Sequence, residues 1–401
     1  MTEISISRLR LLSVSLLACF TVLSLLMSYQ LSGKTGSNQT FWLSVSGSFL
    51  IIGFFLIWMI IKAKAGWVIN TCLLYVVLGL FFIWPEMFLR LSGFRYESGV
   101  EFGYPRPHEF VNFEPDEKLF WRLKPDQPGV NSLGFPGAEF DFEKESNVFR
   151  IVFLGDSVTQ QGYPYICQSI LNTQGNGEKY EAVSLAVSGY SSHQGRVLAQ
   201  NYAHRLDPDV AVVFFGWNDH WLAYGDTDAN KKVEVTEESV GRQLLKKIYH
   251  ELRLLQLGVW VVSKVSQTES VKSLGVQRVP VEQYKANLSS IITVFSSHDV
   301  PVVLLTAPST HAKLGVPEYL VREGFVISAS DAIDLHATYN DVVRQLGDID
   351  GVTVIDLDSL INQADNTQLK QWFMQDGIHL TEAGLEYVAG LLTPVLKDIR
   401  P

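Results

Sequence analysis

Hydrophobic residues follow two different patterns along this chain, one before and one after about residue 90. In the first part, three long apolar runs occupy residues 11–31, 41–61 and 67–84, and none of them contains a charged side chain. A helix rises 1.5 Å per residue, so roughly 17–25 apolar residues are needed to cross a bilayer. The pattern therefore predicts a membrane module over residues 1–91 with three transmembrane helices.

The basic residues beside these runs predict how the module is oriented. Arg8 and Arg10 precede the first run, Lys62 and Lys64 follow the second, and Lys34 alone lies between the first two. Positive charge favours the cytoplasmic side, so the N-terminus is expected inside and the large domain outside, in the periplasm. A secretory signal is the alternative for the first run, but no cleavage site of the usual kind follows it and two more runs do. The prediction is a multi-pass protein of the cell (inner) membrane.

Beyond residue 148, short apolar runs alternate with helical stretches. The runs lie at 150–154, 181–187, 210–215, 301–306 and 352–356, and the helical stretches at 163–173, 193–205, 281–297, 331–346 and 381–398. Strands that are apolar without polar alternation are buried on both faces, as in a parallel sheet covered by helices. We therefore predict an α/β domain over residues 149–401.

Two segments depart from this alternation. Residues 92–148 are rich in Gly, Pro, Phe and acidic residues and predict an irregular connector packed on the domain, because its aromatic side chains need burial. Residues 226–280 form an insertion, within which 242–264 has apolar residues at helical spacing. We expect a helix packed on the domain there; a lid, or a helix lying on a membrane, would fit the same spacing.

Charge and cysteine content argue against some classes of function and of binding site. The first 100 residues carry a net charge of +4 and the remainder a net charge of −14, which disfavours nucleic acid as a partner. Of the three cysteines, Cys19 and Cys72 lie within apolar runs and Cys167 is alone in the large domain, so neither a disulfide framework nor a cysteine metal site is expected.

Ser157 is the first candidate for chemistry, because it follows an apolar run in "VFLGDSVTQ". In parallel sheets, functional groups gather at the carboxyl ends of the strands. A serine nucleophile needs an imidazole to take its proton and a carboxylate to orient that imidazole. His379 and Asp376 in "QDGIHLTEAG" have a spacing that lets one loop provide both, although each residue alone also fits an ordinary turn.

Two more strand ends offer hydrogen-bond donors for a tetrahedral intermediate. Gly189 in "VSGYSSHQG" allows its backbone N–H to approach a ligand closely, and Asn218 in "FFGWNDH" has a side-chain amide. Each residue also fits a tight turn or a helix cap. Trp217 and His220 flank Asn218 and are predicted to touch substrate.

The four blocks, in this order, resemble the signature blocks of the SGNH, or GDSL, hydrolase family over about residues 148–398. The resemblance implies a three-layer α/β/α, flavodoxin-like fold in which Ser157 is the nucleophile, His379 the general base and Asp376 its orienter. It also implies an oxyanion hole formed by Ser157, Gly189 and Asn218, and no metal or organic cofactor. The stretch "VNSLGFPGAEF" is similar to one in membrane-linked members that are associated with envelope polysaccharides. Ser184 stands where a related thioesterase/lysophospholipase has asparagine.

The reaction expected from this resemblance is acyl transfer through an acyl-serine intermediate. If water accepts the acyl group, the protein is an esterase, for example one that removes O-acetyl groups from an envelope glycan or exopolysaccharide. If a sugar hydroxyl accepts it, the protein is an O-acyltransferase that requires a multi-span membrane partner. The same fold would also suit a lipase or lysophospholipase, or a catalytically idle assembly subunit.

Overall fold

The computed structural model describes residues 84–94, 112–125, 127–174, 179–235, 240–265 and 273–400, together with a few single residues nearer the N-terminus. The chain divides into two compact units. One comprises residues 1–98 and 239–268, and the other comprises residues 99–238 and 269–401.

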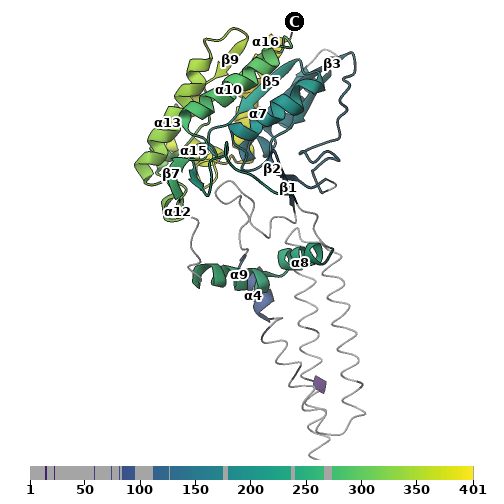
Figure 1. Ribbon diagram of the computed structural model, residues 1–401, viewed down its shortest axis with the longest axis vertical. Helices are drawn as coiled ribbons and strands as arrows, with labels where there is room; N and C mark the ends of the chain where they lie inside the picture. Colours follow the sequence, from purple (N-terminus) through teal and green to yellow (C-terminus); the bar gives the residue numbers. More distant parts are fainter. Residues whose placement is uncertain are drawn as a thin grey trace, which may run out of the picture. The chain divides into compact units, whose positions relative to one another are not determined.

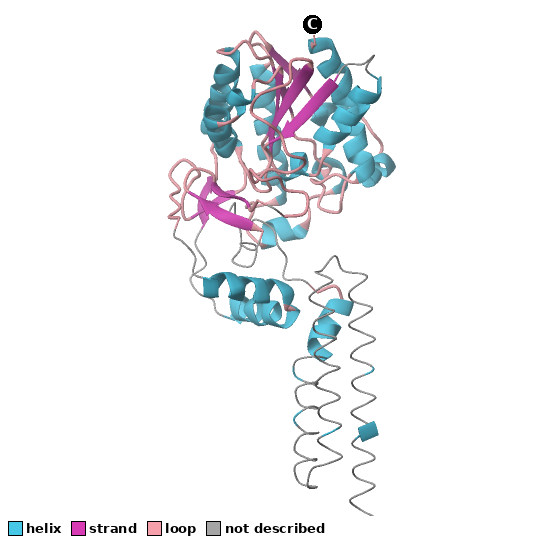
Figure 2. Ribbon diagram, turned by 90° about the vertical axis from the view of Figure 1, so that its right-hand side faces the viewer, coloured by secondary structure: helices cyan, strands magenta, loops and turns pink. Residues whose placement is uncertain are grey.

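The larger unit is built on a five-stranded parallel sheet. Its strands are β3 (Val148–Gly155), β4 (Lys179–Ser184), β5 (Val210–Phe214), β8 (Val302–Leu305) and β9 (Val352–Ile355), in the order β4-β3-β5-β8-β9. All residues of β3, β5 and β8 are buried, which explains why these strands read as continuous apolar runs. Figure 2 shows the sheet between two layers of helices.

Alternate side chains of the central strand pack into two separate cores. Val152 and Leu154 join the core under α7 (Ser192–Asn201), α10 (Val281–Ser296) and α13 (Ala329–Leu346), whereas Ile151 and Phe153 face the opposite core. Helices α7, α10 and α13 are labelled in Figure 1. The second core lies under α6 (Tyr163–Gln174), α14 (Leu357–Ile361), α15 (Asn366–Trp372) and α16 (Glu382–Ile399). The shorter helices are α5 (Ser157–Gln160), η3 (Ala203–Leu206), α11 (His311–Leu314) and α12 (Glu318–Arg322). This α/β/α sandwich agrees with the prediction.

The strand order places a topological switch point at the carboxyl end of β3. The next strand along the chain, β4, lies on one side of β3, and β5 lies on the other. The connecting helices α6 and α7 therefore cover opposite faces of the sheet. Ligands of such folds bind in the crevice outside the carboxyl ends of the strands at this point. Ser157 begins α5 directly after β3.

An antiparallel hairpin lies within the segment predicted as an irregular connector. Its strands are β1 (Phe113–Asp116) and β2 (Phe120–Leu123), which include Pro115 and alternate only weakly between apolar and polar residues. Phe113, Phe120 and Trp121 are buried in the core that also contains α7. The hairpin is thus an integral part of the α/β unit.

The insertion at 226–280 is framed by a second antiparallel pair, β6 (Leu222–Tyr224) and β7 (Ser273–Gln277). The helix expected at 242–264 is two helices, α8 (Val240–Glu251) and α9 (Arg253–Val265), and these group with residues 1–98 rather than with the α/β unit. In that smaller unit, Glu86 of α4 (Trp84–Leu91) accepts hydrogen bonds from the N–H groups of Arg253 and Leu254 at 2.9 and 2.7 Å. A carboxylate at a helix N-terminus is favourable, which explains why α9 starts there.

The membrane part of the predicted fold class is corrected. Within the described ranges, no helix combines the length and the apolar character needed to cross a bilayer. The two longest described helices, α13 and α16, have 18 residues each and carry acidic and basic side chains. The predicted spans at 11–31, 41–61 and 67–84 lie outside the described residues except at isolated positions. The location at a cell membrane stays a prediction of the sequence.

Candidate active site

Ser157 lies at the point where β3 ends and α5 begins. Asp156 caps the helix, since its carboxylate accepts a hydrogen bond from the N–H of Val158 at 2.9 Å. Ser157 is therefore the first residue of the helix, where a backbone N–H has no partner within the helix. This position leaves the Ser157 N–H available as a donor beside the serine's own hydroxyl.

Three residues form one hydrogen-bonded chain across the ends of β3 and the loop before α16. The Ser157 Oγ lies 2.8 Å from His379 Nε2, although the two residues are 222 positions apart. On the other side of the ring, His379 Nδ1 lies 2.6 Å from Asp376 Oδ2. With Nδ1–H donating to the carboxylate, Nε2 is free to accept the serine proton. The structure brings together all three residues that the sequence assigned to this role.

The loop that carries Asp376 and His379 depends on a glycine and on a neighbouring strand end. Gly377 has φ +71°, and a Cβ atom there would lie 2.5 Å from Thr310 Oγ1. The Thr310 N–H donates to the Gly377 carbonyl at 3.2 Å, and His311 Nε2 donates to the Asp376 carbonyl at 2.8 Å. Sequence reasoning missed Thr310 and His311, which follow β8 but belong to none of the four recognised blocks.

Asp376 and His379 shift each other's protonation in the sense that catalysis needs. Burial lowers the pKa of His379, but the hydrogen bond and the charge of Asp376 outweigh it and raise the pKa above its ordinary value. Burial raises the pKa of Asp376, but the interactions with His379 and two backbone N–H groups outweigh it and lower the pKa. Asp376 is therefore ionised at neutral pH and stabilises an imidazolium on His379.

The two predicted oxyanion donors lie on loops after the strands that flank β3. Gly189 follows β4 and has φ +82°, a conformation that favours glycine. Asn218 follows β5, and its Nδ2 donates to the Tyr190 carbonyl at 3.1 Å and to Asp156 Oδ2 at 3.3 Å. Because β4, β3 and β5 are adjacent and parallel, these loops converge with Ser157 at one edge of the sheet.

Asp156 is an unusual neighbour for a nucleophile. Its side chain is completely buried, and burial raises its pKa to about 7 against the opposing effects of the Val158 N–H, His379 and Asn218. Burial therefore favours the protonated form of this carboxyl group more than in an exposed aspartate. Asp156 also accepts a hydrogen bond from Asn218, the residue of the third block, so its charge acts directly on that amide.

Trp217 and His220, the two residues predicted to touch substrate, are buried beside Asn218. Trp217 is 2% exposed and stacks on His336 with ring centroids 4.0 Å apart. His220 is fully buried, and its Nε2 lies 3.1 Å from His336 Nδ1. Burial lowers the pKa of His336 to about 3, so this pair is uncharged at neutral pH. Both residues therefore pack against α13 through His336.

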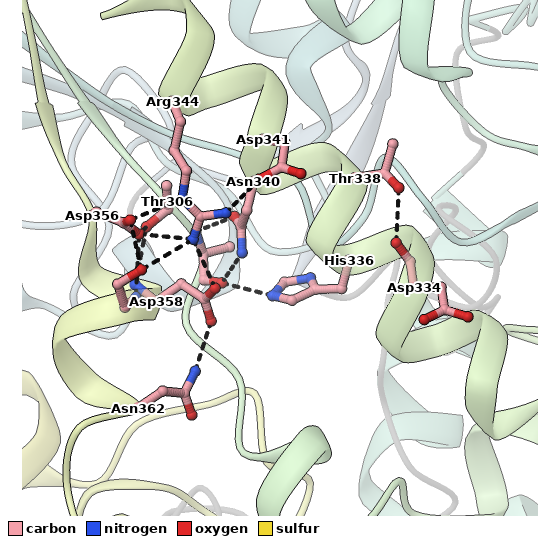
Figure 3. Close-up of polar contacts among 12 residues, drawn as sticks. Thr306, Asp334, His336, Thr338, Asn340, Asp341, Arg344, Asp356, Asp358 and Asn362 are labelled. Atoms are coloured by element: carbon pink, nitrogen blue, oxygen red, sulfur yellow. Dashed lines mark hydrogen bonds and ion pairs between the residues drawn. The ribbon is translucent and has the colours of Figure 1, made fainter.

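A second polar cluster, drawn in Figure 3, lies at the ends of β8 and β9. Arg344 of α13 donates to Asp341, Asp356 and Asp358, and Thr306 also donates to Asp356. Asn340 and His336, from the same helix, both donate to the Ala307 carbonyl. The three carboxylates are all paired with Arg344, and the described residues contain no group of three or more ligands suited to a metal ion. We interpret this cluster as structural, because it anchors the segment that leads to Thr310 and His311.

Comparisons with known proteins identify relatives of the larger unit. A family model described as the GDSL-like Lipase/Acylhydrolase family matches residues 153–387. The isoamyl acetate-hydrolyzing esterase 1 homolog of Homo sapiens is 22% identical over 254 residues, which are 62% of this chain and 81% of that protein. The GDSL esterase/lipase CPRD49 of Arabidopsis thaliana is 26% identical over 209 residues, which are 51% and 72% of the two chains.

Solved structures with some likeness carry related descriptions. The lipase/acylhydrolase from Enterococcus faecalis matches with a TM-score of 0.40 and 17% identity, over 62% of this chain and 95% of that chain. The acetyl xylan esterase AlAXEase matches with a TM-score of 0.39 and 18% identity, over 61% and 98%.

Proposed function

The chain belongs to the GDSL-like lipase/acylhydrolase family and is a serine hydrolase, and we propose that it cleaves short-chain carboxylic esters through an acyl-serine intermediate on Ser157. The observation that carries the proposal is the continuous hydrogen-bonded chain from Ser157 through His379 to Asp376. The triad is complete and Asp376 is ionised, which supports an enzyme rather than a catalytically idle subunit.

Acylation follows from this geometry. The Ser157 Oγ attacks the ester carbonyl carbon while His379 Nε2 takes the hydroxyl proton, and the carbonyl oxygen becomes an oxyanion. The N–H groups of Ser157 and Gly189 and the amide of Asn218 stabilise that negative charge. When the tetrahedral intermediate collapses, the ester C–O bond breaks and His379 returns its proton to the leaving alcohol.

Deacylation repeats these steps with water as the nucleophile. His379 Nε2 takes a proton from water, whose oxygen attacks the acyl carbon of the Ser157 ester. Collapse of the second intermediate breaks the bond to Ser157 Oγ, which recovers its proton from His379. The products are the carboxylic acid and the regenerated serine, and Asp376 keeps its charge throughout.

We place acetyl esters of sugar hydroxyls first among the substrates. The acetyl group is supported by the similarity to isoamyl acetate-hydrolyzing esterase 1 homologs, whose name refers to hydrolysis of an acetate ester. The sugar is supported by the resemblance of residues 130–140 to a stretch in polysaccharide-associated members. An envelope or exopolysaccharide glycan with O-acetyl groups is the substrate that combines both features.

The test compares the full chain with its Ser157→Ala and Ser169→Ala variants. Ser169 is an exposed serine of α6, so its variant is a matched control for loss of a hydroxyl group. Acetate release from nitrophenyl acetate and from an O-acetylated polysaccharide is expected in the wild type and in the control, and to fall to background in Ser157→Ala.

Two results contradict parts of the proposal. Acetate release that survives Ser157→Ala contradicts the nucleophile assignment. Transfer of the acetyl group to an added glycan in place of acetate release contradicts hydrolysis and identifies an O-acyltransferase.

A further inference from the structure

Gly189 is held from both sides by two buried side chains that belong to none of the four recognised blocks. The indole N–H of Trp121 donates to the Ser188 carbonyl at 3.1 Å. Arg278 Nη1 donates to the Gly189 carbonyl at 3.0 Å. Trp121 comes from β2 and Arg278 from the residue after β7, so both come from segments outside the α/β alternation. Both side chains are fully buried.

The contact from Trp121 directly determines where the Gly189 N–H points. The Ser188 carbonyl and the Gly189 N–H belong to one peptide unit, which is planar and trans, so the two groups point in opposite directions. A donor that holds the carbonyl on the hairpin side therefore turns the N–H away from the hairpin. The Ser188 N–H is also fixed, since it donates to Gln160 Oε1 of α5 at 2.6 Å.

The contact from Arg278 fixes the following peptide unit, and it is itself rigidly held. Arg278 pairs with Asp228 through two hydrogen bonds, Nε to Oδ1 at 3.2 Å and Nη2 to Oδ2 at 2.8 Å. The Asp228 carboxylate also accepts a hydrogen bond from Ser191 Oγ at 2.7 Å. A paired, planar guanidinium allows little movement of the carbonyl that it holds.

Glycine needs such external restraint more than any other residue. Its backbone visits positive and negative φ about equally, so Gly189 does not hold its own N–H in one direction. We propose that Trp121 and Arg278 are positioning residues of the oxyanion hole, which keep the Gly189 N–H aimed at the developing negative charge. This inference rests on the proposed function, because it takes the Gly189 N–H as an oxyanion donor.

The test uses the full chain with Trp121→Phe and Arg278→Met. Trp121→Phe keeps an aromatic ring and removes the donor, so it is the milder change. Loss of one oxyanion donor costs roughly 100- to 1,000-fold in kcat, so misdirecting one is expected to cost about 10-fold or more. KM for nitrophenyl acetate and the pH of the acid limb should stay unchanged, because the triad is untouched. Binding of a trifluoromethyl ketone analogue should weaken in parallel with kcat/KM.

Matched controls separate positioning from a loss of stability. Tyr165→Phe removes another aromatic donor to a backbone carbonyl, that of Pro136, and Arg150→Gln breaks a partly buried ion pair, with Glu181. Their side-chain hydrogen bonds go to other segments, from Tyr165 to Pro136 and from Arg150 to Phe142, Glu181 and Leu206. These controls should lower stability without lowering kcat. If Arg278→Met fails to fold because Asp228 is left unpaired, Trp121→Phe decides the question.

Specific outcomes overturn the inference. A folded Trp121→Phe variant with kcat within twofold of wild type, or a change in KM alone, contradicts it. An equal fall in kcat in the controls assigns Trp121 and Arg278 a purely structural role. Ser157→Ala is measured together with these variants. If Ser157→Ala keeps activity, the proposed function is wrong. If Ser157→Ala is inactive and Trp121→Phe has wild-type activity, only the positioning role is wrong.

Discussion

The side-chain amide of Asn218 donates to Asp156 Oδ2 at 3.3 Å, and so links the third recognised block to the residue before the nucleophile. The second amide hydrogen is donated to the Tyr190 carbonyl at 3.1 Å. Both hydrogens of the amide thus have an acceptor before substrate binds. The bond to Asp156 is the longer and weaker of the two, so it is the one that an oxyanion would replace.

Asn218→Ala is expected to lower kcat by about 100- to 1,000-fold with little change in KM, because the amide acts on charge that develops only in the transition state. Steady-state kinetics on nitrophenyl acetate check this. Asn172→Ala is the control, since Asn172 exchanges hydrogen bonds with the backbone of Tyr180 on α6 and β4. A normal kcat in folded Asn218→Ala would remove Asn218 from the oxyanion hole.

The acid limb of kcat/KM should lie above pH 6.5, the ordinary value for histidine, because Asp376 raises the pKa of His379. The general base must be neutral, so activity is lost as the pH falls through that raised pKa. In Asp376→Asn the negative charge that raises the pKa of His379 is removed, while the burial that lowers this pKa remains. The acid limb of kcat/KM should therefore move to lower pH. The kcat of this variant should fall by up to about 10,000-fold. A limb that stays in place or moves to higher pH would show that Asp376 does not act on His379.

Gly377→Ala should destabilise the fold and lower activity together. The residue has φ +71°, and an added Cβ would lie 2.5 Å from Thr310 Oγ1 and 2.8 Å from the His311 ring. The backbone conformation alone costs about 1–2 kcal/mol for a non-glycine residue. Urea unfolding and kcat measure the two effects. Gly390→Ala in α16 is the control, since nothing lies within 4 Å of its added Cβ and alanine is expected to stabilise the helix.

Asp219→Asn should stabilise the protein at pH 8 more than at pH 5. Asp219 is fully buried, burial raises its pKa to about 7, and its Oδ2 has no hydrogen-bond partner among the described residues. A raised folded-state pKa favours folding at low pH, and this contribution is lost as the pH rises toward 7. Asparagine does not titrate, so the difference in free energy of unfolding between Asp219→Asn and the wild type should increase by about 3 kcal/mol between pH 5 and pH 8.

Urea unfolding at the two pH values provides this comparison. Asp350→Asn, at an exposed turn before β9, reports the effect of removing a solvated carboxylate. An Asp219→Asn variant whose advantage is equal at pH 5 and pH 8 would contradict a buried, titrating Asp219.

The sequence by itself was enough to predict the parallel sheet and to single out Ser157, Asp376 and His379, which the structure joins by hydrogen bonds. Short apolar runs that alternate with helical stretches are typical of a parallel sheet covered on both faces, and strands β3, β5 and β8 are buried in this way. Ser157, Asp376 and His379 were recognisable because each lies in a short motif at a predicted strand or loop end. Buried strands and short motifs of this kind can be predicted from the local sequence alone.

Only the tertiary structure decided what surrounds the triad. Trp121 lies in a hairpin that the sequence reads as irregular, and Arg278 follows an insertion, so neither shows any local sign of its contact with the Gly189 loop. Trp217 and His220, predicted to touch substrate, are buried, and α13 brings His336 against them. These hydrogen bonds join residues that are 67, 89 and 116 positions apart in the sequence. They depend on how whole elements pack, and that packing is not encoded in the pattern of any one segment.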